Sequence, residues 1–289
     1  MKVLSLWPLT ENARRRLEEA ANVVEDASDR PLSREELAQR LSDVDGLICF
    51  PLTAKLDGAL IASAPRLRVI ATVAVGYDNI DLRVCAERGI AVGNTPGVVA
   101  NATADIGMAL ILATMRRIVS GVDFIRAGRW ERGEMHSYGN DLATKTLGIF
   151  GMGAIGSALA RRAYAAEMTV IYHNRNPRPD KTDARYVSFE ELLRESDVVA
   201  VTSPLTPQTR GVFGAEAFAK MKRGAYFVNI ARGGVVQTDA LYEALRSGHL
   251  AYAGLDVTDP EPLPLSHPLF TLPNVVVIPH MGTSTPETR

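Results

Sequence analysis

The sequence predicts an α/β protein with two doubly wound parallel sheets. Short apolar runs alternate with helix-like segments over roughly the first hundred residues, and a more regular alternation follows between residues 146 and 281. An apolar segment from Pro96 to about residue 119 separates the two regions. A helix this apolar should be buried on nearly all faces, and a junction between domains provides such burial. We therefore expect one domain over residues 1–96 and a second over residues 97–289.

The first region begins with an apolar run, KVLSLW at 2–7, which predicts a buried strand, and residues 10–20 predict a helix. A second helix should begin after Ser33, because Ser33 and Glu36 have the spacing of a capping box, in which each satisfies the other's free N–H group. Two further apolar runs are predicted to be strands: GLICF (46–50) and RVIAT (68–72).

The second region predicts six strands. They are TLGIF (146–150), MTVIYH (168–173), DVVAVT (197–202), AYFVNI (225–230), YAGLDV (252–257) and NVVVI (274–278). Helices fit between them at about 154–166, 188–195, 215–221 and 238–247. Right-handed crossovers through these helices make a doubly wound sheet. The proline-rich run DPEPLPLSHP after the fifth strand excludes a helix and requires an extended loop.

The composition excludes several classes of protein. The net charge of −1, with both signs mixed along the chain, gives no electrostatic footprint for nucleic acid or an anionic membrane. The only cysteines, Cys49 and Cys85, cannot build a disulfide framework, which favours a reducing compartment. The first apolar run is too short for a signal peptide, and no apolar stretch reaches about 18 residues. We expect a cytoplasmic protein.

A glycine-rich turn, Gly151-Met-Gly153-Ala-Ile-Gly156, follows the strand at 146–150 and opens a helix. In a dinucleotide site, Gly151 permits the tight turn, Gly153 lets the backbone approach a pyrophosphate, and Gly156 lets helix and strand pack closely. The pyrophosphate then lies at the helix N-terminus, where free N–H groups favour negative charge. The alternative is that these glycines only make a turn.

The end of the next strand bears on which dinucleotide is bound. NAD enzymes usually carry an acidic residue about 20 residues after the motif, paired with the ribose 2′-OH. Here the strand ends in the run from Ile171 to Arg178, which contains no carboxylate. Arg175 can instead bind a 2′-phosphate through charge-assisted hydrogen bonds. We therefore predict a preference for NADPH, with NADH possible; the alternative is a solvated basic loop.

Three residues supply what the reduction of a keto acid requires. Arg232 follows the fourth strand, and its planar guanidinium suits a bidentate carboxylate. His280 follows the sixth strand and can donate and recover a proton near neutrality. Glu261 follows the fifth strand, and a carboxylate beside an imidazole favours the protonated ring and fixes its orientation.

Each of these residues also has an ordinary interpretation when taken alone. Arg232 could be a surface ion-pair partner, His280 a hydrogen-bonded structural residue, and Glu261 a solvated loop acid. All three nevertheless follow the carboxyl ends of strands in one sheet, as the glycine-rich turn does, and ligands bind at that edge of open α/β sheets. The other histidines show no metal-ligand spacing to each other, no G-x-S-x-G motif occurs, and neither cysteine has a nucleophile context. We predict no metal.

At these residues the chain resembles the D-isomer-specific 2-hydroxyacid dehydrogenase family, and most closely its glyoxylate/hydroxypyruvate reductase branch. The similarity spans nearly the whole chain. It is carried by VAVGYDNID (73–81), GMGAIG (151–156), PLTPQT (204–209), VNIARGG (228–234), GLDVTDPEP (254–262) and PHMG (279–282). The spacings of 29 and 19 residues that join Arg232, Glu261 and His280 also suit this branch.

The resemblance implies a Rossmann dinucleotide-binding domain and a smaller flavodoxin-like substrate domain. It implies that His280 is the general acid/base, Glu261 its partner and Arg232 the carboxylate anchor. It also implies that the backbone N–H groups of Val75 and Gly76 bind the same carboxylate from the other domain. The cofactor residues are expected to be Thr103, Gly151, Gly153, Ala154, Ile155, Gly156, Asn174, Arg175, Pro204, Thr209, Ile230 and Asp256, with Asp256 orienting the nicotinamide. The stretch NRNPRP (174–179) is similar to that of NADPH-using reductases.

By the same resemblance the protein is a homodimer to which the segment after Pro96 contributes. Family members usually continue with a helix that returns to the first domain, so we expect that this helix is missing or not included beyond Arg289. The family often places an aromatic residue of the neighbouring subunit over the substrate, and the stretch Met135–Gly139 is not a clear match. Two alternatives stay open. One is the same chemistry on a larger keto acid, such as hydroxyphenylpyruvate, 2-ketogluconate or 3-phosphohydroxypyruvate, and the other is a non-catalytic, nucleotide-sensing protein like a known corepressor of this fold.

Overall fold

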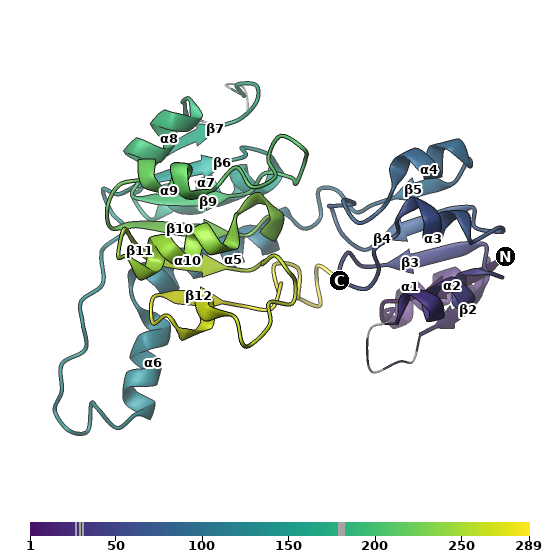
Figure 1. Ribbon diagram of the computed structural model, residues 1–289, viewed down its shortest axis with the longest axis horizontal. Helices are drawn as coiled ribbons and strands as arrows, with labels where there is room; N and C mark the ends of the chain where they lie inside the picture. Colours follow the sequence, from purple (N-terminus) through teal and green to yellow (C-terminus); the bar gives the residue numbers. More distant parts are fainter. Residues whose placement is uncertain (27, 29, 31, 179–182) are drawn as a thin grey trace. The chain divides into compact units, whose positions relative to one another are not determined.

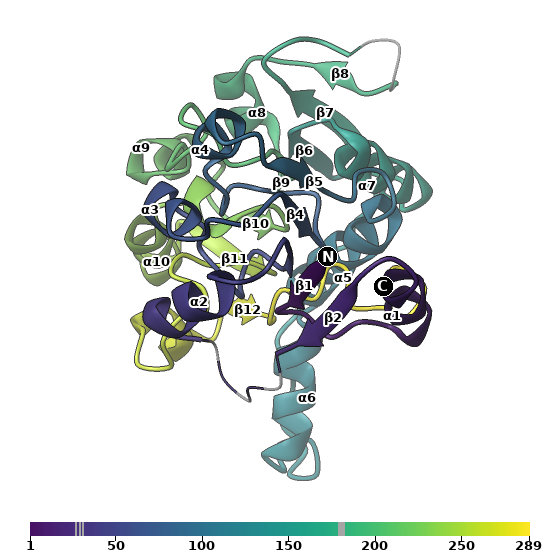
Figure 2. The same ribbon diagram turned by 90° about the vertical axis from the view of Figure 1, so that its right-hand side faces the viewer.

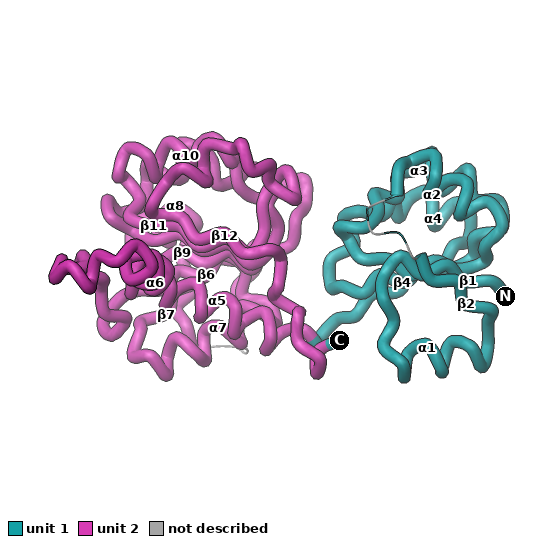
Figure 3. The backbone as a smooth tube through the Cα atoms, turned by 90° about the horizontal axis from the view of Figure 1, so that it is seen from below, with its two compact units in different colours: residues 1–98, 289 teal, residues 99–288 magenta. Residues whose placement is uncertain are grey.

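The computed structural model describes residues 1–26, 28, 30, 32–178 and 183–289 (Figure 1). The chain forms two compact units, one of Met1–Val98 together with Arg289 and one of Val99–Thr288 (Figure 3). Each unit contains one parallel sheet with helices between its strands. The predicted class, two doubly wound α/β domains, is confirmed.

The first unit has the strand order β2-β1-β3-β4-β5, which is the flavodoxin-like order. Its strands are β1 (Lys2–Ser5), β2 (Asn22–Glu25), β3 (Gly46–Cys49), β4 (Val69–Thr72) and β5 (Ala91–Gly93). Its helices are α1 (Glu11–Glu18), α2 (Arg34–Leu41), α3 (Gly58–Ala62) and α4 (Leu82–Glu87). The central strands bury Leu4, Leu47 and Ile70 almost completely, so the core lies along the middle of the sheet.

Four elements of this unit had no clear signal in the sequence. The edge strands β2 and β5 are short and only partly buried, so no continuous apolar run marks them. The helices α3 and α4 each begin at an aspartate, Asp57 and Asp81, whose side chain accepts a hydrogen bond from the N–H group three residues later. The predicted capping box at Ser33 and Glu36 is present at the start of α2.

The second unit has the strand order β12-β11-β10-β9-β6-β7-β8, with all strands parallel. Its strands are β6 (Thr146–Phe150), β7 (Thr169–His173), β8 (Arg185–Tyr186), β9 (Val198–Val201), β10 (Ala225–Asn229), β11 (Leu250–Leu255) and β12 (Val275–Val277). Its α-helices are α5 (Ala100–Met115), α6 (Ile118–Arg126), α7 (Ala154–Ala165), α8 (Phe189–Glu195), α9 (Ala215–Lys220) and α10 (Thr238–Arg246). The order reverses between β6 and β9, which is the switch point of a Rossmann sheet.

Strand β9 shows how this sheet is covered on both faces. All four of its residues are fully buried. Val198 and Ala200 pack into the core that contains α5 and α7, whereas Val199 and Val201 pack into the core that contains α8, α9 and α10. Because side chains alternate along a strand, a continuous apolar run is what a strand buried on both faces requires.

Three details differ from the expectations. The sheet has a seventh strand, β8, which is only two residues long and was not predicted. The apolar segment after Pro96 is not one helix, because Arg117 adopts a left-handed conformation (φ 54°) and separates α5 from α6. A short 3₁₀ turn, Pro268–Thr271, lies in the region where proline was expected to exclude any helix.

Helix α5 is also not buried on nearly all faces. One side packs on α7 and β11, and Gly107 on that side allows close approach, since a Cβ there would lie 2.7 Å from Cδ1 of Ile230. On its other side Leu112 is 36% exposed. Helix α6 projects from the sheet (Figures 1 and 2), and its apolar side chains Ile118 and Ile125 are exposed. No helix among the described residues is both long and apolar enough to cross a membrane.

Candidate active site

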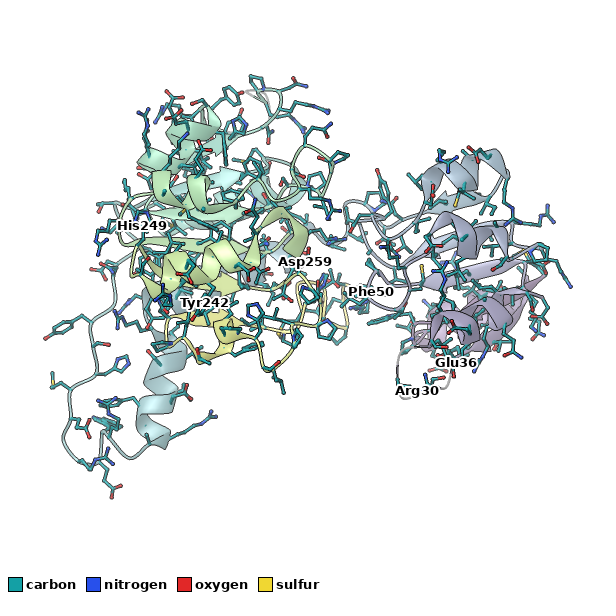
Figure 4. The ribbon with its side chains drawn as sticks, in the orientation of Figure 1. Arg30, Glu36, Phe50, Tyr242, His249 and Asp259 are labelled. Carbon is teal, nitrogen blue, oxygen red and sulfur yellow. The ribbon has the colours of Figure 1, made fainter. Side chains whose placement is uncertain are left out.

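The carboxyl ends of the strands in the second unit share one edge of the sheet, because all of these strands are parallel. Figure 4 marks the two ends of β11: His249 comes immediately before this strand, and Asp259 lies beyond its other end. The segments that follow β6, β9, β10, β11 and β12 therefore meet at the edge where open α/β sheets bind their ligands.

The glycine-rich turn connects β6 to α7 at this edge. Gly151 has φ 112°, and a Cβ there would lie 2.5 Å from the backbone nitrogen of Ser203. A Cβ on Gly156 would lie 2.4 Å from the carbonyl oxygen of Gly151, so both positions require glycine. Gly153 faces open space and is the N-cap of α7, with no side chain capping the helix. The first-turn N–H groups, which include those of Ala154 and Ile155, are therefore placed to receive an anion, as a dinucleotide requires.

The end of β7 lies beside this turn. The Oδ1 atom of Asn174 accepts a hydrogen bond from the backbone N–H of Met152 at 2.6 Å, so Asn174 holds the glycine-rich turn directly. Arg175 follows and is exposed. No carboxylate lies between His173 and Arg178, and Pro179, the last residue of the NRNPRP stretch, is outside the described residues.

His280 and Glu261 are in contact. Nδ1 of His280 lies 2.8 Å from Oε1 of Glu261, and the two side chains are 14% and 18% exposed. An ionised carboxylate can only accept a hydrogen bond, so Nδ1 of His280 donates to Glu261, and Nε2 is the other ring nitrogen, which can exchange a proton. This pair joins the loop after β11 to the turn after β12.

Asp256, at the end of β11, holds the backbone that carries His280. Its side chain accepts hydrogen bonds from the N–H groups of Met281 at 2.6 Å and Gly282 at 3.0 Å, and its carbonyl accepts one from the N–H of His280 at 2.9 Å. His280 itself has a left-handed backbone (φ 48°), which needs such support. Burial raises the pKa of Asp256, while the two N–H donors act in the opposite direction.

Arg232 follows β10 and is half-buried. Its backbone carbonyl accepts a hydrogen bond from Nδ2 of the buried Asn229 at 2.9 Å, and its Nη1 donates to the carbonyl of Ala231 at 2.8 Å. The next residue, Gly233, has no room for a Cβ, which would lie 1.9 Å from the carbonyl oxygen of Thr258. The loop after β10 therefore passes directly against the loop that carries Glu261.

The remaining cofactor residues are spread along the same unit. Thr103 on α5 donates to the carbonyl of Gly282 at 3.3 Å, which places it beside the His280 turn. Thr209 closes its own loop by donating to the carbonyl of Pro204 at 2.7 Å. The side chain of Ile230 is buried against α5, so any cofactor contact of Ile230 falls to its backbone.

In the first unit, Val75 and Gly76 lie in the loop after β4, and both are half-buried. The side chain of Asn94 donates to the carbonyl of Val75 at 2.8 Å and so holds this loop. Among the residues that the structure describes, no group of three or more histidine, cysteine, aspartate or glutamate side chains is arranged to hold a metal ion.

Sequence reasoning missed Asn229 and Gly282 as parts of the site. Asn229 is a fully buried polar residue whose amide holds Arg232, and a Cβ on Gly282 would lie 2.9 Å from Oδ2 of Asp256. The available signal for Asn229 was a polar residue at the end of an otherwise apolar strand. Gly282 has no comparable signal, because its requirement comes from a residue 26 positions earlier in the chain.

Comparison with known proteins adds to this geometry. Residues 108–282 match the family model described as "D-isomer specific 2-hydroxyacid dehydrogenase, NAD binding domain". The chain is 43% identical to a glyoxylate reductase of Pyrococcus furiosus, over 100% of this chain and 88% of the relative. It is 42% identical to the glyoxylate reductase/hydroxypyruvate reductase of Mus musculus, over 100% and 90% of the two chains. A solved NADPH-dependent glyoxylate/hydroxypyruvate reductase from Sinorhizobium meliloti, in complex with NADP and malonate, superposes with a TM-score of 0.88 at 31% identity, covering 99% of this chain and 88% of that one.

Proposed function

Because the chain belongs to the D-isomer specific 2-hydroxyacid dehydrogenase family and is an NAD(P)-dependent oxidoreductase, we propose that it reduces glyoxylate and hydroxypyruvate to their 2-hydroxy acids and prefers NADPH. The observation that carries the proposal is the 2.8 Å contact between His280 and Glu261 at the sheet edge that also holds the glycine-rich turn. The Pyrococcus furiosus relative is a glyoxylate reductase, and the Mus musculus relative is a glyoxylate reductase/hydroxypyruvate reductase. The glycine-rich turn has the open, uncapped helix start that a dinucleotide needs.

In this proposal the bound nicotinamide cofactor supplies the hydride, and the protein supplies the proton. His280 donates a proton from Nε2 to the oxygen of the keto group as negative charge develops there. Glu261 keeps Nδ1 occupied, so that the ring has one orientation and its protonated form is stabilised by a neighbouring negative charge. Asp256 is a positioning residue for this step, since it holds the turn on which His280 stands.

Arg232 is the proposed anchor of the substrate carboxylate, through paired charge-assisted hydrogen bonds. We assign substrate binding to residues 1–96, with the backbone N–H groups of Val75 and Gly76 as further donors, and dinucleotide binding to residues 97–289. The loop that holds Val75 and Gly76 follows the carboxyl end of a strand, where ligands bind in open sheets of this kind.

The preference for NADPH rests on the end of β7. Arg175 is exposed there, and the neighbouring Asn174 is already bonded to Met152, so Arg175 is the group offered to a ligand. A 2′-phosphate gains charge-assisted bonds to a guanidinium, and no carboxylate in the 173–178 segment repels it. NADH lacks this phosphate and should bind less tightly.

A homodimer is the proposed assembly, with the surface around α6 as its interface. Ile118, Val122 and Ile125 on α6 are each more than two fifths exposed, and Trp130 and Met135 beyond it are 69% and 80% exposed. A cavity of about 910 Å³ adjoins α6 and is partly lined by apolar residues. A second copy of the chain would bury this surface, which a monomer in water would leave uncovered. Sedimentation of the wild type and of Ile125→Glu tests this: the variant should sediment as a monomer.

The function is tested by following oxidation of NADPH and of NADH with a panel of keto acids. We expect turnover of glyoxylate and hydroxypyruvate, and a higher kcat/KM with NADPH. Faster turnover of hydroxyphenylpyruvate, 2-ketogluconate or 3-phosphohydroxypyruvate would replace the proposed substrates. Dinucleotide binding without turnover of any keto acid would favour a nucleotide-sensing protein instead.

A further inference from the structure

Two tyrosine hydroxyls attach the loop that carries Arg175 to the sheet. The hydroxyl of Tyr186 donates a hydrogen bond to the carbonyl oxygen of Asn174 at 3.2 Å. The hydroxyl of Tyr172 accepts one from the backbone N–H of Arg178 at 2.7 Å. Arg175 therefore lies between two fixed points of the backbone, one on each side.

The two tyrosines are placed by the pairing of β7 with β8. Strands β7 and β8 lie side by side (Figure 2). Tyr172 and Tyr186 are direct partners in their register, and the two ring centroids lie 5.5 Å apart in an edge-to-face arrangement. The Tyr186 ring also stacks on His173, at 6.0 Å and 22°. Strand β8 consists of only two residues, and one of them, Tyr186, holds the loop that carries Arg175.

The environment of Tyr172 requires its hydroxyl to have a hydrogen-bond partner. The side chain is 1% exposed within the core beneath α7, where a phenylalanine would fill the same space without a polar group to satisfy. A buried hydroxyl needs a hydrogen-bond partner, and the N–H of Arg178 provides it. The start of the loop is held a second time, because the side chain of Asn174 accepts a hydrogen bond from the backbone N–H of Met152.

We propose that Tyr172 and Tyr186 are positioning residues for cofactor discrimination: by holding the loop backbone on both sides of Arg175, they keep its guanidinium where a 2′-phosphate binds. The inference rests on the proposed preference for NADPH. The strength of a charge-assisted hydrogen bond depends on its geometry. If the loop had to become ordered when the cofactor binds, the conformational entropy lost by the loop would lower the affinity for the 2′-phosphate. NADH has no 2′-phosphate and so does not use Arg175, and its binding should not depend on the two tyrosine hydroxyls.

The test uses Tyr172→Phe and Tyr186→Phe, singly and together, in the full chain. For each hydroxyl we expect KM for NADPH to rise about fivefold, which is the usual worth of one hydrogen bond. The KM for NADH and the kcat at saturating NADPH should stay unchanged. Affinity for adenosine 2′,5′-bisphosphate, measured by calorimetry without any keto acid, should fall by the same factor, whereas affinity for 5′-AMP should not.

Tyr226→Phe is the matched control. Tyr226 is a buried tyrosine of the same sheet, and its hydroxyl accepts a hydrogen bond from Nδ2 of Asn140 at 2.7 Å, far along the chain from the loop. Loss of the Tyr226 hydroxyl should lower the unfolding temperature as much as Tyr172→Phe does. The ratio of kcat/KM with NADPH to kcat/KM with NADH should stay unchanged. Equal losses with both cofactors, or no loss with NADPH, in the Tyr172 and Tyr186 variants would overturn the inference.

Arg175→Ala separates this inference from the function on which it rests. If the wild type prefers NADPH and Arg175→Ala abolishes that preference while the tyrosine variants retain it, only the positioning role is wrong. If the wild type uses NADH equally well, the proposed cofactor preference fails and the positioning role fails with it. If the wild type prefers NADPH but Arg175→Ala leaves that preference unchanged, the preference stands without Arg175, and the positioning role again fails.

Discussion

Replacing Glu261 by glutamine removes one negative charge from the 2.8 Å contact with His280 while keeping the size of the side chain and one acceptor oxygen. At this distance, and with an effective dielectric constant of about 20, two opposite charges attract by roughly 6 kcal/mol before the cost of removing them from water. That cost offsets most of the attraction for side chains that are 14% and 18% exposed. The effect of Glu261→Gln is therefore better estimated from the difference in free energy between a charge-assisted and a neutral hydrogen bond, which is about 1–2 kcal/mol.

A loss of about 1–2 kcal/mol from the protonated imidazole corresponds to a fall of roughly five- to thirtyfold in the rate of reduction. We expect this fall in kcat for glyoxylate reduction at neutral pH, measured by oxidation of NADPH. Glu216→Gln is a suitable control, because Glu216 is a carboxylate 86% exposed on α9 and paired with Lys220. A kcat within twofold of the wild type, in a variant with an unchanged unfolding temperature, would refute the role of Glu261 in the reaction.

Three further predictions follow from the same site. His280→Ala should lower kcat by about 10²–10⁴, the usual worth of general acid–base catalysis, and an unchanged kcat with glyoxylate would remove His280 from the mechanism. Arg232→Ala should raise KM for glyoxylate by about 10²-fold, through loss of charge-assisted bonds, and an unaffected KM would exclude Arg232 as the carboxylate anchor. Because burial raises the pKa of Asp256 in the folded state, its contribution to stability is fully present below its ordinary value of 3.8 and is lost as pH rises through the folded-state pKa. The free energy of unfolding of the wild type and of Asp256→Asn can be compared by urea unfolding at several pH values. As pH rises from about 4 toward neutrality, the wild type should lose stability relative to the variant. A difference between the two that is independent of pH would contradict this prediction.

Most of the second unit's sheet could be predicted from the sequence, since its strands are continuous apolar runs. Strand β9 is the clearest case: its residues are buried on both faces, and such a run is distinctive without any alignment. The two-residue strand β8 could not be predicted, because it exists only through its pairing with β7. The division between α5 and α6 was also missed, since nothing in the run of apolar residues shows that Arg117 adopts a left-handed backbone.

The sequence alone shows which chemical groups are available: a glycine-rich turn, a guanidinium, a carboxylate and an imidazole, each after a predicted strand of one parallel sheet. The presence of these groups depends on residue type, and their places after strands depend on short segments of sequence, so both can be predicted without knowledge of distant contacts. How these groups are held is visible only in the folded chain, where Asp256 supports the His280 turn and Asn229 holds Arg232. Two tyrosine hydroxyls likewise hold the loop of Arg175. These are hydrogen bonds whose partners depend on strand register and on how closely loops pass, and register is a property of the assembled sheet.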